Sequence, residues 1–153
     1  MKENRRAQCG IRGLTRLYAL QVLYSNHFLN EKEIDPTKWI GDDAEILLSD
    51  EMSVKDIDKQ FFSDLINRLQ QNLSKIDAQI QQNIAKTWSF DRLDKVMQEL
   101  LRLGVCEILF FKEIPHNVIF NEYIEIAKAF FEKNEVSFVN GLLNSVSNKF
   151  PDK

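Results

Sequence analysis

The spacing of apolar residues between positions 54 and 84 constrains the fold more than any other feature of the chain. These residues recur three or four positions apart: Val54, Ile57, Phe61, Leu65, Leu69, Leu73, Ile76, Ile80 and Ile84. Such spacing places side chains on one face of an α-helix, whereas a β-strand needs alternation at every second residue. Ser53 and Ser74 can each cap a helix start, so we predict two consecutive helices with a bend near residues 72–74.

Other segments are also typical of helices. Further helices are predicted at residues 14–28, around 38–48, at 89–111, after Pro115 and after Asn134. Ser89 and Asn134 can cap the helices that follow them. Residues 14–28 and 103–111 are apolar on nearly all sides, which indicates helices enclosed by neighbours. Five glycines and three prolines are too few for a loop-rich or sandwich architecture. We therefore predict an all-α protein of about seven helices.

Positive charge is concentrated near the start of the chain, although the formal net charge is −3. Residues 1–16 carry five basic side chains against Glu3, a local charge of +4. Residues 30–58 instead hold ten acidic side chains against three lysines, a local charge of −7. The negative net charge argues against indiscriminate nucleic-acid binding, yet the segregation of charge provides one basic edge that could bind a polyanion.

Several classes of functional site are not supported by the sequence. It contains no glycine-rich phosphate loop, no GxSxG elbow and no HExxH motif. Cys9 and Cys106 are the only cysteines, and they form no CxxC pair, so neither a zinc site nor a disulfide framework is indicated. No apolar run approaches the roughly 18 residues that span a bilayer. We predict a cytoplasmic protein without catalytic residues, metal or cofactor.

The basic edge has the features that RNA binding requires. Arg12 and Arg16 are four residues apart and so share one helical face. Arg5 and Arg6 precede that helix, and we expect them on a flexible arm that reaches phosphates. Single-stranded RNA also uses aromatic rings, each worth roughly 1–3 kcal/mol per stacked base. The candidate rings are Tyr18, Tyr24, Phe130 and Phe138. From the residues alone, these rings could equally belong to the core and the arginines could simply be solvated.

Three phrases of the sequence carry a resemblance to a known family. They are "ALQVLYS" at 19–25, "SFDRLDKVMQELLRLGVCEIL" at 89–109 and "IPHNVIFNEYIEIAKAFFEKNEVSFVNGLLNSV" at 114–146. Together with the preceding arginines, they closely resemble the NusB family of bacterial transcription antitermination factors. The resemblance spans nearly the whole chain except the acidic segment 30–53, which has no assigned role.

The resemblance implies both a fold and partners. The fold would be a single domain over residues 1–153, with two perpendicular helical bundles at about 12–86 and 88–150. The first helix would start with a basic RNA-binding motif. The protein partner would be the small-subunit ribosomal protein NusE, and the pair would bind boxA of nascent ribosomal RNA and link it to RNA polymerase.

The resemblance also assigns residues to the RNA interface. Arg12 and Arg16 fall in the arginine-rich motif, and Gln21 and Tyr24 lie in its continuation. Gly13, Leu14 and Thr15 stand where further basic or small polar residues are expected, so RNA affinity would be lower unless Arg5 and Arg6 compensate.

The turn before the last helix is a second expected RNA contact. Asn134 occupies a place where the family often has an acidic residue, and the loss of that negative charge should strengthen RNA binding. Phe130 and Phe138 flank this turn and are candidate rings for base contact.

The protein partner is expected on the face built by residues 89–126. Candidate members of that face are Arg102, Glu107, Asn121 and Glu122. The alternative is that these side chains tie helices together within the fold. Gly141 is expected to serve close helix packing, because a glycine in a helix lets another backbone approach.

Two other functions stay open. The first is a helical protein–protein interaction module that never touches RNA. The second is a stand-alone relative of the helical module found at the front of ribosomal RNA cytosine methyltransferases, whose activity needs a cofactor-binding α/β domain that we do not expect after Lys153. A homodimer that covers the basic edge is a further alternative for the free protein.

Overall fold

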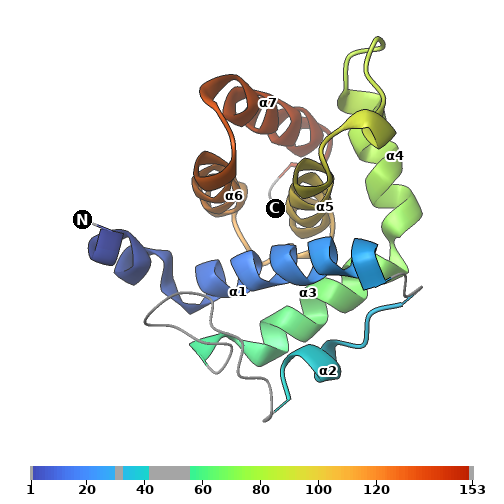
Figure 1. Cartoon of the computed structure of the whole chain (residues 1–153). Coiled ribbons are helices and arrows are strands. Elements are labelled where there is room, and N and C mark those ends of the chain that lie inside the picture. Colours follow the sequence, from blue (N-terminus) through green and yellow to red (C-terminus); the bar gives the residue numbers. More distant parts are fainter. Residues whose placement is uncertain (1, 30–32, 42–55, 152–153) are drawn as a thin grey trace. The chain divides into compact units, whose positions relative to one another are not determined.

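The computed structural model describes residues 2–29, 33–41 and 56–151, without the side chains of residues 2–9. Within these ranges it contains seven α-helices and no strand, which confirms the all-α prediction (Figure 1). The helices are α1 (Lys2–Leu29), α2 (Pro36–Trp39), α3 (Lys59–Gln71), α4 (Leu73–Asn83), α5 (Lys95–Phe110), α6 (His116–Phe130) and α7 (Lys133–Lys149). A short 3-10 turn, η2 (Phe90–Arg92), precedes α5.

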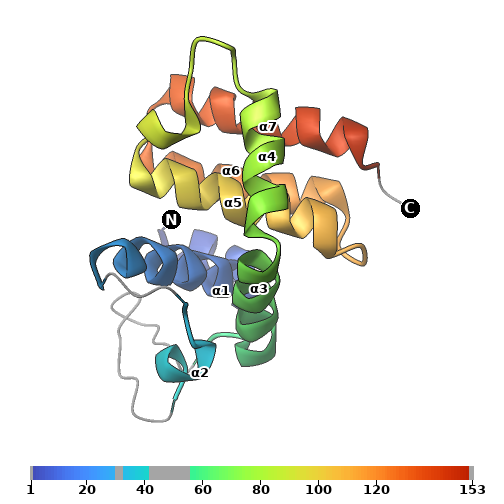
Figure 2. The same cartoon turned by 90° about the vertical axis from the view of Figure 1, so that its right-hand side faces the viewer.

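The chain forms two compact units, residues 1–67 and 68–153. The division falls within α3, whereas the sequence suggested a division near residues 86–88. The physical reason is the packing of α4, which lies against α5 and α7 and therefore belongs to the C-terminal unit. Figure 2 shows α4 crossing these two helices.

The predicted bend between two helices at 72–74 is confirmed. Asn72 leaves the helical conformation, with φ −123° and ψ 21°, and its Nδ2 donates to the Arg68 carbonyl at 2.8 Å. This bond adds a second donor, beside the Asn72 backbone N–H, to a carbonyl in the last turn of α3. Ser74 lies inside α4 and is not its cap, and Ser53 lies outside the described residues.

Two predicted caps are wrong because the helices begin elsewhere. Ser89 precedes η2, and the cap of α5 is Asp94, whose Oδ1 accepts from the backbone N–H of Val96 at 2.8 Å. The last helix begins at Lys133, so Asn134 lies in its first turn. Of the short helix predicted around 38–48, only Lys38 and Trp39 are helical, at the end of α2; Ile40 and Gly41 are not helical, and residues 42–48 lie outside the described part.

The core of the N-terminal unit lies between α1 and α3. Six apolar residues of α1 are buried: Leu14, Tyr18, Ala19, Leu20, Val22 and Leu23. The Tyr18 ring lies 5.2 Å from that of Phe62, and its hydroxyl donates to the Trp39 carbonyl at 2.6 Å. Burial raises the pKa of Tyr18 to about 12. Tyr18 is therefore a core residue and not a ring available for base stacking.

Helix α5 is the centre of the C-terminal unit and packs against α4, α6 and α7. Every residue from 97 to 109 except Arg102 is buried, which includes most of the stretch 103–111 that was predicted to be enclosed. Gly104 faces α7, where an added Cβ would lie 2.9 Å from Cδ2 of Leu143. The glycine that permits close helix packing is therefore Gly104. The expectation for Gly141 is wrong, since Gly141 is exposed with no atom within 4 Å of such a Cβ.

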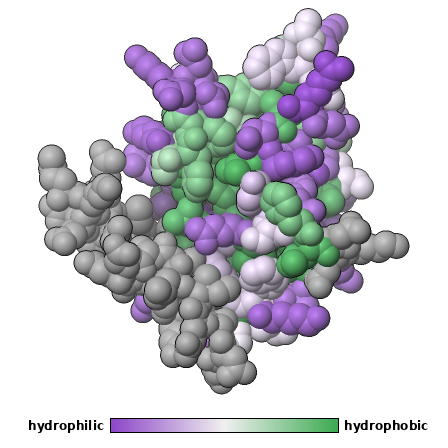
Figure 3. All heavy atoms as spheres, viewed as in Figure 1, coloured by the Kyte–Doolittle hydropathy of each residue, from purple (hydrophilic) through white to green (hydrophobic). Residues whose placement is uncertain are grey.

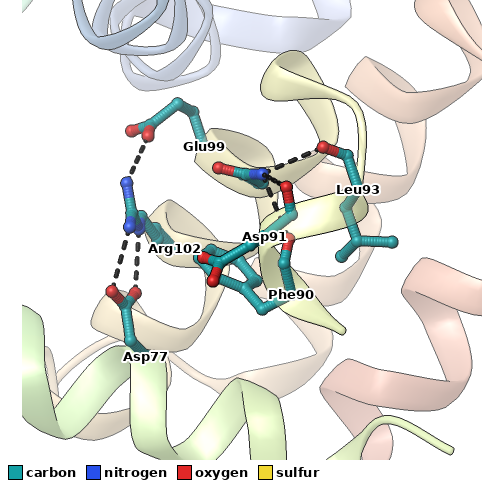
Figure 4. A network of polar contacts seen from close by, with 7 residues as sticks. Asp77, Phe90, Asp91, Leu93, Glu99 and Arg102 are labelled. Atoms are coloured by element: carbon teal, nitrogen blue, oxygen red, sulfur yellow. Dashed lines mark hydrogen bonds and ion pairs between the residues drawn. The ribbon is translucent and has the colours of Figure 1, made fainter. Parts of the chain in front are cut away.

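A polar network holds α4, η2 and α5 together (Figure 4). Arg102 donates from Nε and Nη2 to both carboxylate oxygens of Asp77, at 2.8 and 2.9 Å, and from Nη1 to Glu99 at 2.6 Å. Its guanidinium also lies 4.9 Å from the centre of the Phe90 ring. Burial alone would lower the pKa of Arg102, but the contacts with Asp77 and Glu99 raise it overall.

Gln98 extends this network to the backbone of η2. Its Nε2 donates to the carbonyls of Phe90, Asp91 and Leu93, at 3.1, 3.3 and 2.9 Å. Buried carbonyls outside a helix need such donors. The network therefore fixes the path by which the chain enters α5.

We predict that Gly104→Ala is less stable than Gly141→Ala by about 1–3 kcal/mol in urea unfolding. Both substitutions gain the same helix propensity, so their difference isolates the crowding at Leu143. Equal stabilities would show that α5 and α7 do not approach closely at Gly104.

We predict that Arg102→Ala lowers the free energy of unfolding by roughly 3 kcal/mol, because it breaks the ion pairs that this guanidinium makes with Asp77 and with the buried Glu99. The control is Lys128→Ala, which breaks an exposed pair with Glu125 and should change stability by less than about 1 kcal/mol. Similar small losses in both variants would contradict a structural role for Arg102.

Candidate functional site

The basic residues near the start of the chain lie on both sides of a break in α1. At Gly10 φ is 64° and ψ is −179°, a conformation that glycine adopts without the steric cost other residues have. Arg5 and Arg6 lie in the helical segment before this break. The backbone there is helical, and both the predicted flexible arm and the role of these arginines in RNA binding stay predictions.

Asp58 joins α1 to the start of α3. Its backbone N–H donates to Thr15 Oγ1 at 2.8 Å, and Thr15 in turn donates to the Ile11 carbonyl at 2.6 Å. Asp58 Oδ1 accepts from the backbone N–H of Phe61 at 3.0 Å, which satisfies a donor in the first turn of α3. Thr15, which replaces an expected basic or small polar residue, is thus a buried structural contact.

Arg12 is presented at the surface beside this junction. Its side chain is 52% exposed, and its Nε lies 3.7 Å from Asp58 Oδ2. Its guanidinium carbon lies 4.6 Å from the centre of the Phe61 ring, within the range of a cation–π contact. An exposed pair at this distance contributes little to stability, so the guanidinium can exchange the carboxylate for another anion.

Arg16 reaches the same ring but is only 2% exposed. Its guanidinium carbon lies 5.1 Å from the centre of Phe61. The prediction that both arginines share one helical face is consistent with this geometry. The prediction that both are accessible is wrong for Arg16, because that face also packs against α3.

Further along α1, the two candidates for RNA contact differ in exposure. Gln21 is half-buried, and Tyr24 is 37% exposed. The Tyr24 ring meets that of Phe28 edge to face, with centroids 5.2 Å apart. Phe28 is itself exposed. The end of α1 therefore presents two adjacent rings, of which the sequence singled out one.

A second group of rings lines a pocket in the C-terminal unit. The pocket has a volume of about 180 Å³ and is lined by Trp88, Leu93, Asp94, Met97, Phe131, Asn134, Glu135 and Phe138. The rings of Trp88 and Phe138 lie 5.6 Å apart and are inclined by 31°. This arrangement leaves Trp88 more than half exposed and Phe138 half-buried. We name it the ring pocket.

The structure brings two of the three predicted residues of this region into the ring pocket. Asn134 and Phe138 line it, whereas Phe130 does not and is exposed beside Phe131, with ring centroids 6.4 Å apart. Trp88 was missed by sequence reasoning, although a tryptophan just before the "SFDRLD" phrase was a usable signal. Figure 3 shows hydrophobic residues, in green, reaching the surface among hydrophilic ones.

The residues predicted to bind the protein partner have different environments. Glu107 is fully buried and accepts a hydrogen bond from the Tyr123 hydroxyl, so it is not on a surface and that prediction is wrong. Arg102 is held by Asp77 and Glu99, as the alternative of internal ties anticipated. Asn121 is exposed and Glu122 half-buried, and their role in partner binding stays a prediction.

The remaining titratable side chains offer little chemistry. Cys106 is buried, and burial raises the pKa of its thiol well above the ordinary value, so it stays protonated. His116 is buried, with Nδ1 3.0 Å from Ser147 Oγ. Among residues 2–29, 33–41 and 56–151, no three His, Cys, Asp or Glu side chains are grouped as metal ligands would be. No helix in the same ranges has the length and hydropathy that crossing a membrane requires.

Comparison with known proteins agrees with this architecture. The transcription antitermination protein NusB of Sphingopyxis alaskensis is 32% identical over 147 residues, which cover 94% of this chain and 95% of that protein. The solved structure of T. maritima NusB superposes with a TM-score of 0.73 and 32% identity, over 92% of this chain and 93% of that chain.

A third comparison is with a complex. It is a crystal structure of antitermination factors NusB and NusE with dsRNA, in which the matched chain has a TM-score of 0.69 and 24% identity, over 90% of this chain and 96% of that chain. At this identity the likeness shows the fold. Residues 14–148 of the present chain match the NusB family, and the chain belongs to that family.

Proposed function

We propose that the protein is a transcription antitermination factor that binds single-stranded boxA-type RNA together with the ribosomal protein NusE. The observation that carries the proposal is the exposed Arg12 guanidinium, held on the Phe61 ring at the basic edge of α1. Family membership supports it, since relatives such as the Sphingopyxis alaskensis protein are named transcription antitermination proteins.

In this proposal the protein works by binding alone. The basic edge of α1 contacts phosphates, and the ring pocket accepts an unpaired base. Positive charge gives affinity that depends on salt, whereas stacking on rings gives affinity that depends little on it. NusE completes the binding surface and links the complex to RNA polymerase in the cytoplasm. No bond is made or broken, which makes the protein a scaffold.

Arg12 and Arg16 have different roles in the proposal. Arg12 has an exposed guanidinium that can leave Asp58 for a phosphate. Arg16 is buried against Phe61 and acts through that ring, as a positioning residue. The number of phosphate contacts made by this pair is therefore one.

The ring pocket has properties that suit a nucleobase. Its lining is mainly apolar, and the Trp88 and Phe138 rings provide the flat surfaces on which bases stack. Asn134 brings an amide, which both donates and accepts hydrogen bonds, to a position where an acidic side chain could only accept them. Neutral Asn134 also adds no repulsion toward phosphates.

The first test is RNA binding as a function of salt, with and without NusE. We expect Arg12→Ala to weaken binding of a single-stranded boxA RNA. The slope of the logarithm of the binding constant against the logarithm of salt concentration should fall in magnitude by about one, because one phosphate contact is lost. The control is Lys128→Ala, which removes one exposed positive charge from α6, outside the basic edge of α1 and outside the residues that line the ring pocket, and which should leave the slope unchanged. Absence of RNA affinity in the presence of NusE would instead favour a protein-only module.

The second test concerns the rings. We expect Trp88→Ala and Phe138→Ala each to cost about 1–3 kcal/mol of RNA binding free energy with an unchanged salt slope, because stacking does not release counterions. Circular dichroism of both variants controls for folding. If these variants reduced the salt dependence of RNA binding but kept wild-type RNA affinity at high salt, base stacking in the ring pocket would be contradicted.

A further inference from the structure

The C-terminal unit has a second pocket, which the proposed RNA contacts do not use. It has a volume of about 430 Å³ and is lined by Lys75, Ala78, Gln79, Leu109, Phe110, Lys112 and Phe150. These residues lie at the start of α4, the end of α5 and just after α7. The ring pocket includes Asp94 and Met97 at the start of α5, and the 16 residues of that helix extend over about 24 Å. The two pockets therefore lie at opposite ends of α5.

The charge of the second pocket is positive. Lys75 and Lys112 line it and are exposed, and none of the described residues that line it carries a carboxylate. The Lys112 ammonium lies 6.0 Å from the centre of the Phe150 ring, at the outer limit of a cation–π contact. Between the lysines the lining is apolar, from Ala78, Leu109, Phe110 and Phe150. An occupant that complements this surface carries both negative charge and apolar side chains.

Gln79 gives a second indication of an occupant. Its Oε1 is buried and has no hydrogen-bond partner within the described part of the chain. A buried oxygen without a donor costs about 1–3 kcal/mol, so it favours any ligand that supplies an N–H. Gln79 itself lines the pocket, and the terminal torsion of glutamine is broad, so its amide can reorient when a ligand binds there. A peptide backbone supplies N–H donors at regular intervals.

We infer that this pocket binds an extended peptide segment of a protein partner, in which acidic and apolar side chains alternate. The acidic side chains pair with Lys75 and Lys112, the apolar ones pack on Leu109, Phe110 and Phe150, and a backbone N–H donates to Gln79. The inference goes beyond the proposed function and does not depend on RNA binding. A partner held at this end of α5 leaves the ring pocket at the other end accessible.

The experiment uses a short fluorescent peptide of alternating aspartate and leucine, titrated against the full chain and followed by anisotropy. We expect saturable binding that weakens with salt, and a loss of about threefold to tenfold in affinity for Lys75→Glu and for Lys112→Glu. Gln79→Leu, which removes the acceptor, should also weaken binding. A peptide of alternating lysine and leucine should not bind.

The matched control is Lys133→Glu, which makes the same charge change at the start of α7, at the other end from Phe150. We expect it to leave peptide affinity unchanged, while Lys75→Glu and Lys112→Glu keep wild-type RNA affinity and circular dichroism. No binding of the acidic peptide, equal weakening by Lys133→Glu, or displacement of the peptide by single-stranded RNA would overturn the inference. Arg12→Ala separates the two proposals, because it should weaken RNA binding and leave peptide binding intact.

Discussion

The junction at Asp58 is the contact on which the arrangement of the basic edge depends. Its backbone N–H and carboxylate bind Thr15 and the first turn of α3, which fixes Phe61 beside α1. Phe61 then contacts both Arg12 and Arg16. One acidic residue and one ring thus decide which guanidinium is exposed, in a chain whose net charge is negative.

The C-terminal unit is stabilised by a different set of interactions. There, α5 is buried on nearly all sides, and its polar residues are satisfied internally, Arg102 by two carboxylates and Gln98 by three carbonyls. Gly104 allows Leu143 of α7 to approach. Residues of α5 line the ring pocket at one end of the helix and the lysine-lined pocket at the other, so ligands bound in the two pockets would not compete for the same residues.

Sequence patterns predicted the helices better than the site. Apolar spacing identified α3, α4 and the bend between them, because burial on one face requires that spacing. The caps at Ser89 and Asn134 were misplaced, since a 3-10 turn precedes α5 and Lys133 already starts α7. A helix start that moves by a few residues leaves the spacing of the apolar residues unchanged, so that spacing could not show where α5 and α7 begin.

The burial of Arg16 and Glu107 could not be predicted for a related reason. Spacing shows which residues share a helical face, but it does not show which neighbouring helix covers that face. In α1 the face of Arg16 packs on Phe61, and in α5 Glu107 meets the Tyr123 hydroxyl. Trp88 was missed because it lies between helices, where periodicity gives no signal.

We propose that Arg12 and the ring pocket both contact bound RNA. A heteronuclear NMR titration of the full chain with single-stranded boxA RNA tests this directly. We expect shift changes at Arg12, Trp88 and Phe138, with the Leu109 and Phe110 end of α5 unaffected. Saturable RNA binding that leaves Arg12 and Trp88 unshifted would contradict it.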